Sequence, residues 1–264
     1  MGVFRSFSCA LALLSLATLA PAAGLDNAAW DGLLQRHVRV LADGNATQVD
    51  YAGMRAEEPL LREYLAATAA VQPADFAAWS KAEQLAFLIN VYNASTVALV
   101  LTGDPQIASI KDLGSFLRSP WKRSFIALLG ETRSLDEIEH TLIRGEQGYH
   151  EPRVHFALNC ASIGCPALRA EAYQGALLDA QLSDAQQHFL ADRSRNRLKD
   201  GSLQVSSIFK WYREDFTLNG QRLADYLAAQ AASLSLTPAQ REQLLDETIE
   251  IEFLDYDWRL NRTP

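Results

Sequence analysis

The sequence predicts an α+β fold in which helices pack around a small, mostly antiparallel sheet. Three observations support this class. Apolar residues recur at helical spacing through most of the chain, the extended segments are short, and Asp200-Gly201 is a typical hairpin turn between two of them. Hydrophobic residues make up 48% of the 264 residues, so the chain can bury a sizeable core without a scaffold of disulfides.

Amphipathic spacing or capping signals predict helices along most of the chain. The two strongest signals are capping boxes, which pair Ser80 with Glu83 and Ser134 with Glu137. The first box opens a helix to Leu101 that is apolar on nearly all sides and is therefore expected to be buried. The predicted helices cover residues 28–41, 57–70, 84–101, 134–144, 172–191 and 207–216, and a last one begins at 237.

Extended segments are predicted where an apolar run is short or where apolar and polar residues alternate. Residues 154–158 form the clearest strand, and residues 248–253 alternate as an edge strand with one solvent-exposed face. A short extended piece lies at 49–51, and the hairpin pairs 197–199 with 203–205. These segments are too few and too short to form a large sheet.

The first 23 residues have the pattern of a secretory signal peptide. Arg5 precedes a small and apolar run over 9–20, and Ala22 and Ala23 offer small-residue cleavage sites. No Pro/Gly/Ser-rich linker and no repeat interrupts residues 24–264. We therefore expect them to form a single domain, periplasmic or secreted, without stable membrane insertion after cleavage.

The charge of the chain argues against one class of partner. The formal net charge is −8, and it becomes −9 in the processed chain because the signal peptide carries Arg5 and no acid. Proteins that bind nucleic acid usually present a basic face, so nucleic acid is not an expected partner.

The reactive side chains concentrate in one short stretch, which contains His155, Cys160 and Cys165. Cys160 follows an apolar run and stands among small and turn-forming residues, a setting that suits a thiol nucleophile with His155 as its base. A Cys160–Cys165 disulfide is equally compatible with the spacing, and it would block the nucleophile or make it redox-gated. Cys-x4-Cys with one histidine supplies only three ligands, so neither a metal nor another cofactor is expected.

Strand geometry raises an objection to the nucleophile hypothesis. If residues 154–158 form a strand, His155 and Cys160 point to opposite faces unless the chain bends at Asn159. Glu139 on the helix that Ser134 caps is the expected carboxylate that orients His155. His140 is the alternative base, although adjacent helical residues point to different faces.

Three asparagines are candidates for support of this loop. Asn90 and Asn93 are three residues apart and share one face of the buried helix, where amide side chains need partners. Their side chains, together with backbone N–H groups from Asn159 to Gly164, would either form an oxyanion hole or hold the loop in place.

Six strings of the sequence, taken in order, resemble the DUF547 family, and the resemblance covers the chain from about Val49 to Asn261. The family's pattern of Glu, His and Cys is similar to that of papain-like and transglutaminase-like thiol enzymes in permuted order. The resemblance therefore implies a single DUF547-like domain and allows a permuted papain-like arrangement. The strings are residues 86–94, 109–112, 134–140, 155–166, 207–212 and 253–258.

These expectations combine into an exported thiol hydrolase or acyl-transfer enzyme, similar to cysteine peptidases, that acts on an amide, peptide or thioester. Cys160 would be the nucleophile, His155 its base and Glu139 the group that orients the base. A small molecule or a peptide is the expected substrate. The alternative is a non-catalytic periplasmic binding or scaffold domain in which Cys160 and Cys165 form a structural or redox pair.

Overall fold

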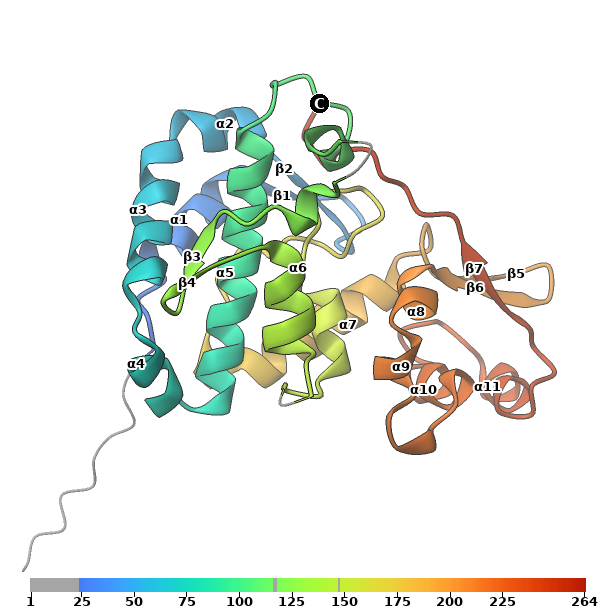
Figure 1. The fold of residues 1–264 in the computed structure, drawn as a ribbon. Helices are drawn as coiled ribbons and strands as arrows, with labels where there is room; N and C mark the ends of the chain where they lie inside the picture. The colour runs from blue at the N-terminus through green and yellow to red at the C-terminus, as the bar shows by residue number, and fades with distance from the viewer. Residues whose placement is uncertain (1–23, 116–117, 147) are drawn as a thin grey trace, which may run out of the picture.

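The computed structural model describes residues 24–115, 118–146 and 148–264, and the predicted signal peptide lies outside the described residues. Helices predominate and the sheets are small, which is the α+β class that the sequence predicts (Figure 1). The helices are α1 Ala28–His37, α2 Tyr51–Ala56, α3 Glu58–Ala70, α4 Pro73–Ala78, α5 Lys81–Leu101, α6 Leu135–Glu137, α7 Leu178–Ala191, α8 Ile208–Trp211, α9 Arg213–Phe216, α10 Leu223–Ala229 and α11 Pro238–Leu245.

Short helical turns of other types join these helices. The segment η3 is a π-helical turn that continues α6, and the others are 3₁₀ turns. Their bounds are η1 Ile110–Leu113, η2 Pro120–Lys122, η3 Ile138–Ile143, η4 Pro152–Phe156, η5 Gly175–Leu177 and η6 Leu218–Gly220.

The strands form three separate sheets. β1 pairs with β2, β3 with β4 and β5 with β6, all antiparallel, and β7 adds to β6 in parallel. The hairpin at Asp200-Gly201 is confirmed, and both residues have positive φ, as its turn type requires. The strands are β1 Val38–Val40, β2 Thr47–Val49, β3 Ile126–Leu128, β4 Glu131–Arg133, β5 Arg197–Lys199, β6 Ser202–Ser206 and β7 Ile251–Leu254.

The long helix α5 is the centre of the larger core. The predicted capping box is present: the Ser80 hydroxyl accepts from the Glu83 N–H, and the Glu83 carboxylate accepts from the Ser80 N–H. Among the described residues, α5 is the one helix whose length and apolar composition would suit a membrane span, and 94% of that stretch is buried inside the protein. Its all-round apolar surface is therefore explained by its central position.

Two hydrophobic clusters make up the core. The larger one surrounds α5, and the second one is built by the end of α7, the elements from there to β7, and Phe156. In Figure 1, α8 to α11 and the sheet of β5, β6 and β7 lie together beside the α5 bundle. Val154 and Leu158 belong to the larger cluster, whereas Phe156 belongs to the second. The turn η4 therefore runs between the two clusters and places His155 at their junction.

The strand predicted for residues 154–158 is wrong, because this segment begins with the 3₁₀ turn η4. Pro152 occupies the first turn, where its fixed φ favours a helical start, and the Glu151 carboxylate accepts a hydrogen bond from the Arg153 N–H at 3.1 Å. The apolar run reflects burial against two clusters instead of a place in a sheet. The objection that strand alternation separates His155 from Cys160 no longer applies.

Three predicted helices differ in extent, and the one predicted for 172–191 begins only at Leu178, after the 3₁₀ turn η5. The helix predicted for 28–41 ends at His37, because the β-branched residues Val38 and Val40 pair with β2. The helix predicted for 207–216 is divided at Tyr212 into α8 and α9. The division at Tyr212 turns the aromatic side chains of residues 207–216 toward different neighbours.

Candidate functional site

One cavity of about 210 Å³ brings the predicted reactive residues together. It is lined by Glu139 and His140 from η3, His155 from η4, and Cys160 and Cys165 from the loop that follows. Aromatic side chains form much of the remaining wall: Tyr92, Trp121, Trp211, Tyr212, Tyr256 and Trp258.

Cys160 and Cys165 are joined by a disulfide, with 6.0 Å between their Cα atoms. Cys165 is buried, whereas Cys160 is partly exposed. The Cys160 sulfur lies 3.1 Å from the Tyr256 hydroxyl and 3.2 Å from the Ser162 hydroxyl. In this bridged state Cys160 is not a nucleophile, and only reduction of the bridge would release its thiol.

His155 is buried and held on two sides. Its Nε2–H donates to Asp215 Oδ2 at 2.6 Å, and its ring stacks on Tyr212 with 3.9 Å between the ring centroids. Burial lowers the pKa of His155, and the hydrogen bond to Asp215 opposes this effect without cancelling it. Because the Asp215 carboxylate accepts the hydrogen bond from Nε2–H, the proton of the neutral ring is on Nε2, and Nδ1 is its basic nitrogen.

Asp215 at the end of α9 is the residue that sequence reasoning missed. Its carboxylate also accepts from Arg144 Nε at 2.5 Å, and the Arg144 guanidinium lies over the Tyr212 ring. Burial alone would raise the pKa of Asp215, but the hydrogen bonds from His155 and Arg144 outweigh it and lower the pKa. Asp215 therefore stays ionised beside the imidazole.

Glu139 lines the cavity but does not hold His155 as expected. Its carboxylate accepts a hydrogen bond from the Tyr92 hydroxyl of α5 at 3.2 Å, and the described residues show no hydrogen bond between Glu139 and His155. Asp215 occupies the position that the sequence assigned to Glu139 because it contacts Nε2 directly. His140, the alternative base, is half-exposed and faces Arg144.

The three asparagines bind backbone groups. Asn90 donates to the Tyr173 carbonyl at 2.8 Å and accepts from its N–H at 2.9 Å. Asn93 donates to the Ala157 carbonyl at 3.0 Å and accepts from the Asn159 N–H at 2.8 Å. Asn93 therefore ties α5 to the chain immediately before Cys160, which is the loop-supporting role.

The loop around Cys160 is internally bonded. Asn159 accepts a hydrogen bond from the Ala161 N–H at 3.0 Å, and Ala161 has a φ of 60°, a left-handed conformation that is uncommon for a residue with a side chain. The N–H groups of Ile163 and Gly164 donate to backbone carbonyls of the C-terminal segment. The Cys160 N–H points at the Cys165 sulfur at 2.7 Å.

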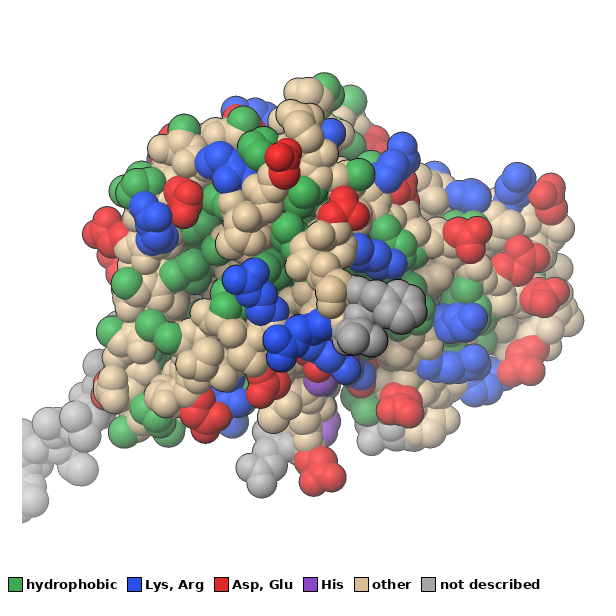
Figure 2. All heavy atoms as spheres, turned by 45° about the horizontal axis from the view of Figure 1, so that its top comes forward, with side chains coloured by type: hydrophobic (Ala, Val, Ile, Leu, Met, Phe, Trp, Pro, Cys, Tyr) green, Lys and Arg blue, Asp and Glu red, His purple; other side chains and the backbone are tan. Residues whose placement is uncertain are grey.

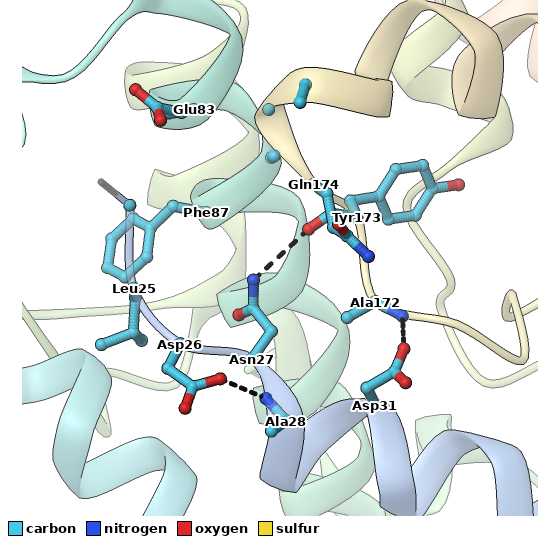
Figure 3. Close-up of a pocket in the computed structure, with 14 residues that line it drawn as sticks. Leu25, Asp26, Asn27, Ala28, Asp31, Glu83, Phe87, Ala172, Tyr173 and Gln174 are labelled. Carbon is cyan, nitrogen blue, oxygen red and sulfur yellow. Dashed lines mark hydrogen bonds between the residues drawn. The ribbon is translucent and has the colours of Figure 1, made fainter. Parts of the chain in front are cut away.

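A larger cavity of about 430 Å³ lies elsewhere, between the start of α1, α5 and residues 172–176 (Figure 3). Polar groups that line this cavity form hydrogen bonds with the backbone of the protein. Asp31 accepts from the Ala172 N–H at 2.8 Å, and Asp26 accepts from the Ala28 N–H at 2.9 Å. Neither histidine nor cysteine is among its described lining residues, so it lacks the chemistry of the smaller cavity.

Among the residues that the structure describes, no group of three or more His, Cys, Asp and Glu side chains is arranged to hold a metal ion.

Comparison with known proteins finds one family model that matches part of the chain. Residues 76–190 match the model of the family described as "Protein of unknown function, DUF547". The match includes α5, η3 and the Cys160 loop, and it ends before Asp215 and Tyr256. No curated protein and no solved structure matches the chain.

Proposed function

We propose that this protein is an exported thiol hydrolase or acyl-transfer enzyme that becomes active when the Cys160–Cys165 bridge is reduced. Its substrate is an amide, a peptide or a thioester. The observation that carries the proposal is the shared cavity, which contains the Cys160 sulfur and a buried imidazole oriented by an ionised Asp215.

Reduction is the first step of the proposed cycle. A dithiol attacks the bridge through its thiolate, forms a mixed disulfide, and then closes to its own disulfide. The dithiol loses two electrons and two protons, and Cys160 and Cys165 become thiols. Cys160 is the sulfur that a reductant would reach more readily, because it is the more exposed of the two.

Acyl transfer follows from the thiol form. His155 Nδ1 takes the Cys160 proton, and the thiolate attacks the carbonyl carbon of the substrate. The bond from this carbon to the leaving nitrogen or sulfur breaks, and His155 returns the proton to the leaving group. Water or another acceptor nucleophile then attacks the Cys160 thioester, which releases the acyl group and restores the thiol.

The proposal includes a papain-like site in which the order of the site residues along the chain is changed. His155 precedes Cys160, and the carboxylate Asp215 follows both. The signal-peptide pattern of residues 1–23 supports export to the periplasm or beyond the cell. An oxidising compartment would keep the Cys160–Cys165 pair bridged until a reductant reaches it.

The bridge itself favours a second candidate function. In a non-catalytic binding or scaffold domain, the Cys160–Cys165 disulfide would fasten the loop between the two hydrophobic clusters. Reduction would then loosen the loop without creating a reactive group.

A chromogenic ester distinguishes the two candidates. The Cys165→Ser variant leaves Cys160 unbridged, and treatment with p-nitrophenyl acetate should release a burst of nitrophenolate and leave an acetyl group on the Cys160 peptide, detected by mass spectrometry. Wild-type protein should show this burst only after incubation with dithiothreitol. The control is the Cys160→Ser, Cys165→Ser double variant, and an equal burst from this control would contradict the proposal.

A further inference from the structure

The segment from η1 to η2 carries an unusual charge for this protein. Between residues 111 and 123 the chain has four cationic side chains, although its formal net charge is −8. All four are exposed, and among the described residues none forms an ion pair with a carboxylate. They are Lys111, Arg118, Lys122 and Arg123.

The one acid of this segment does not neutralise these cations by an ion pair. Asp112 Oδ2 accepts hydrogen bonds from the Ala108 and Ser109 N–H groups, both at 3.0 Å, and so caps η1. Figure 2 shows Lys and Arg side chains gathered close to a histidine on the face it presents. We call the set Lys111, Arg118, Lys122 and Arg123 the basic rim.

The basic rim adjoins the cavity that contains Cys160. Ser119 and Trp121 line the cavity, and three of the four cations flank them in the sequence. The fourth, Lys111, lies with its ammonium 3.5 Å from the centroid of Trp258, another lining residue.

A continuous row of side chains leads from the sulfur to this ammonium. The Tyr256 hydroxyl is 3.1 Å from the Cys160 sulfur, and the Tyr256 ring is 4.5 Å from the Trp258 ring. The Trp211 ring centroid lies 5.8 Å from that of Trp258, and Trp211 is 48% exposed. The ring of Trp121, from η2, lies 5.7 Å from that of Trp258. A large exposed aromatic side chain beside a cavity suits a flat or apolar part of a ligand.

The side chains that line the cavity itself include acids. Asp136 and Glu139 line it, and Asp215 lies behind His155 with Arg144 as its cationic partner. An anion would be repelled there but attracted at the basic rim. The charges thus orient a ligand, with a neutral reacting group inside and a negative group outside.

We infer that the substrate carries an anionic group, a carboxylate or a phosphate, that binds Lys111 and the basic rim while its acyl carbon reaches Cys160 across the aromatic wall. This inference rests on the proposed function, because it assigns the substrate class of the same site. Lys111 binds the anion as a positioned charge and takes no part in the bond changes.

Charged alkylating probes test the inference on the Cys165→Ser variant. Four iodoacetamides share one alkyl spacer and end in a carboxylate, a phosphonate, a neutral carboxamide or a trimethylammonium group. The two anionic probes should alkylate Cys160 about twofold to fivefold faster than the carboxamide probe at low ionic strength. High salt should remove the difference, and the trimethylammonium probe should be slowest.

Substitutions show which side chain causes the preference for anionic probes. Lys111→Met should abolish most of the preference for the anionic probes, and Lys111→Arg should retain it. Lys81→Met is the matched control, because Lys81 lies over Tyr149, outside the cavity, and its loss should leave the preference unchanged.

The outcomes separate this inference from the proposed function. If the carboxamide probe reacts rapidly and the anionic probes gain no advantage, or if the trimethylammonium probe is fastest, the inference is overturned and the proposed function stands. If every probe reacts with Cys160 no faster than with glutathione, the proposed function is overturned, and the inference with it.

Discussion

Two buried histidines, His155 and His37, have closely similar partners. His155 Nε2 lies 2.6 Å from Asp215, which is bound by Arg144. His37 Nε2 lies 3.1 Å from Glu57, which is bound by Arg36. Each is therefore an imidazole next to a carboxylate whose second partner is an arginine.

The surroundings of the two rings differ. His155 lines a cavity together with Cys160, whereas the His37 ring is covered by α2, since a Cβ atom added at Gly53 would lie 2.4 Å from His37 Nδ1. A carboxylate–imidazole pair alone does not indicate catalysis. What distinguishes His155 is that it lines a cavity together with a sulfur-bearing residue, Cys160.

The largest expected effect compares the two histidines directly. In the Cys165→Ser background, His155→Gln should slow iodoacetamide alkylation of Cys160 by about 100-fold, because the base that removes the thiol proton is lost. His37→Gln in the same background should leave the rate unchanged. Equal losses of rate in both variants would mean that His155 acts through the fold and not on the thiol.

The packing of His37 predicts a loss of stability without a loss of reactivity. Gly53→Ala places a methyl group against the His37 ring and the Asp50 carboxylate, and it should lower the free energy of unfolding by about 1–3 kcal/mol in urea titrations. Cys160 alkylation in the native protein should be unaffected. Gly32→Ala in α1 is the control, because its Cβ would meet only the end of the Arg36 side chain, and the substitution should keep or raise stability.

The carboxylates that bind the two histidines can be compared in the same way. Asp215→Asn should reduce the rate of Cys160 alkylation by about tenfold, since the imidazole loses the charged acceptor that orients Nε2. Glu57→Gln, the corresponding change beside His37, should have no effect on this rate. A normal rate for Asp215→Asn would assign the orienting role to another group, with Glu139→Gln as the next variant to measure.

The smallest expected effect is a pH dependence of stability. Burial lowers the pKa of His155 in the folded protein, so the unfolded chain binds more protons as the pH falls through about 6.5. Stability should therefore decrease between about pH 7 and about pH 5.5, by on the order of 1 kcal/mol for this group. Asp215 adds a separate loss below about pH 4, because its folded pKa is lowered.

Urea titrations across this range provide the check. His155→Gln should flatten the dependence between about pH 7 and about pH 5.5, whereas His37→Gln should retain it. A dependence that survives in the His155→Gln variant would show that another group causes it.

Local signals in the sequence were sufficient to predict those elements of the structure that depend on local interactions. The capping boxes at Ser80 and Ser134 and the turn at Asp200-Gly201 form as predicted, because each is completed within a few residues. Residues 154–158 were misassigned because an apolar run of this length fits a strand or a buried turn equally well. Pro152 was the signal that favoured a helical start.

The partner of His155 could not be read from the sequence. Asp215 is 60 residues away, in an Arg-Glu-Asp-Phe segment that resembles a solvated helix face. Its position depends on how α9 packs its buried Phe216 against the second cluster. Glu139 was the reasonable expectation because it lies on a capped helix, but η3 turns its carboxylate to Tyr92.

The central claim is that His155 activates Cys160 once the bridge to Cys165 is opened. The most direct test is the pH dependence of iodoacetamide alkylation at the Cys160 peptide of the Cys165→Ser variant. We predict an apparent pKa well below the value of about 8.5 for a free thiol, and faster alkylation near neutral pH than in the urea-unfolded protein. A profile that follows an ordinary thiol, with native protein reacting more slowly than unfolded protein, would contradict the account.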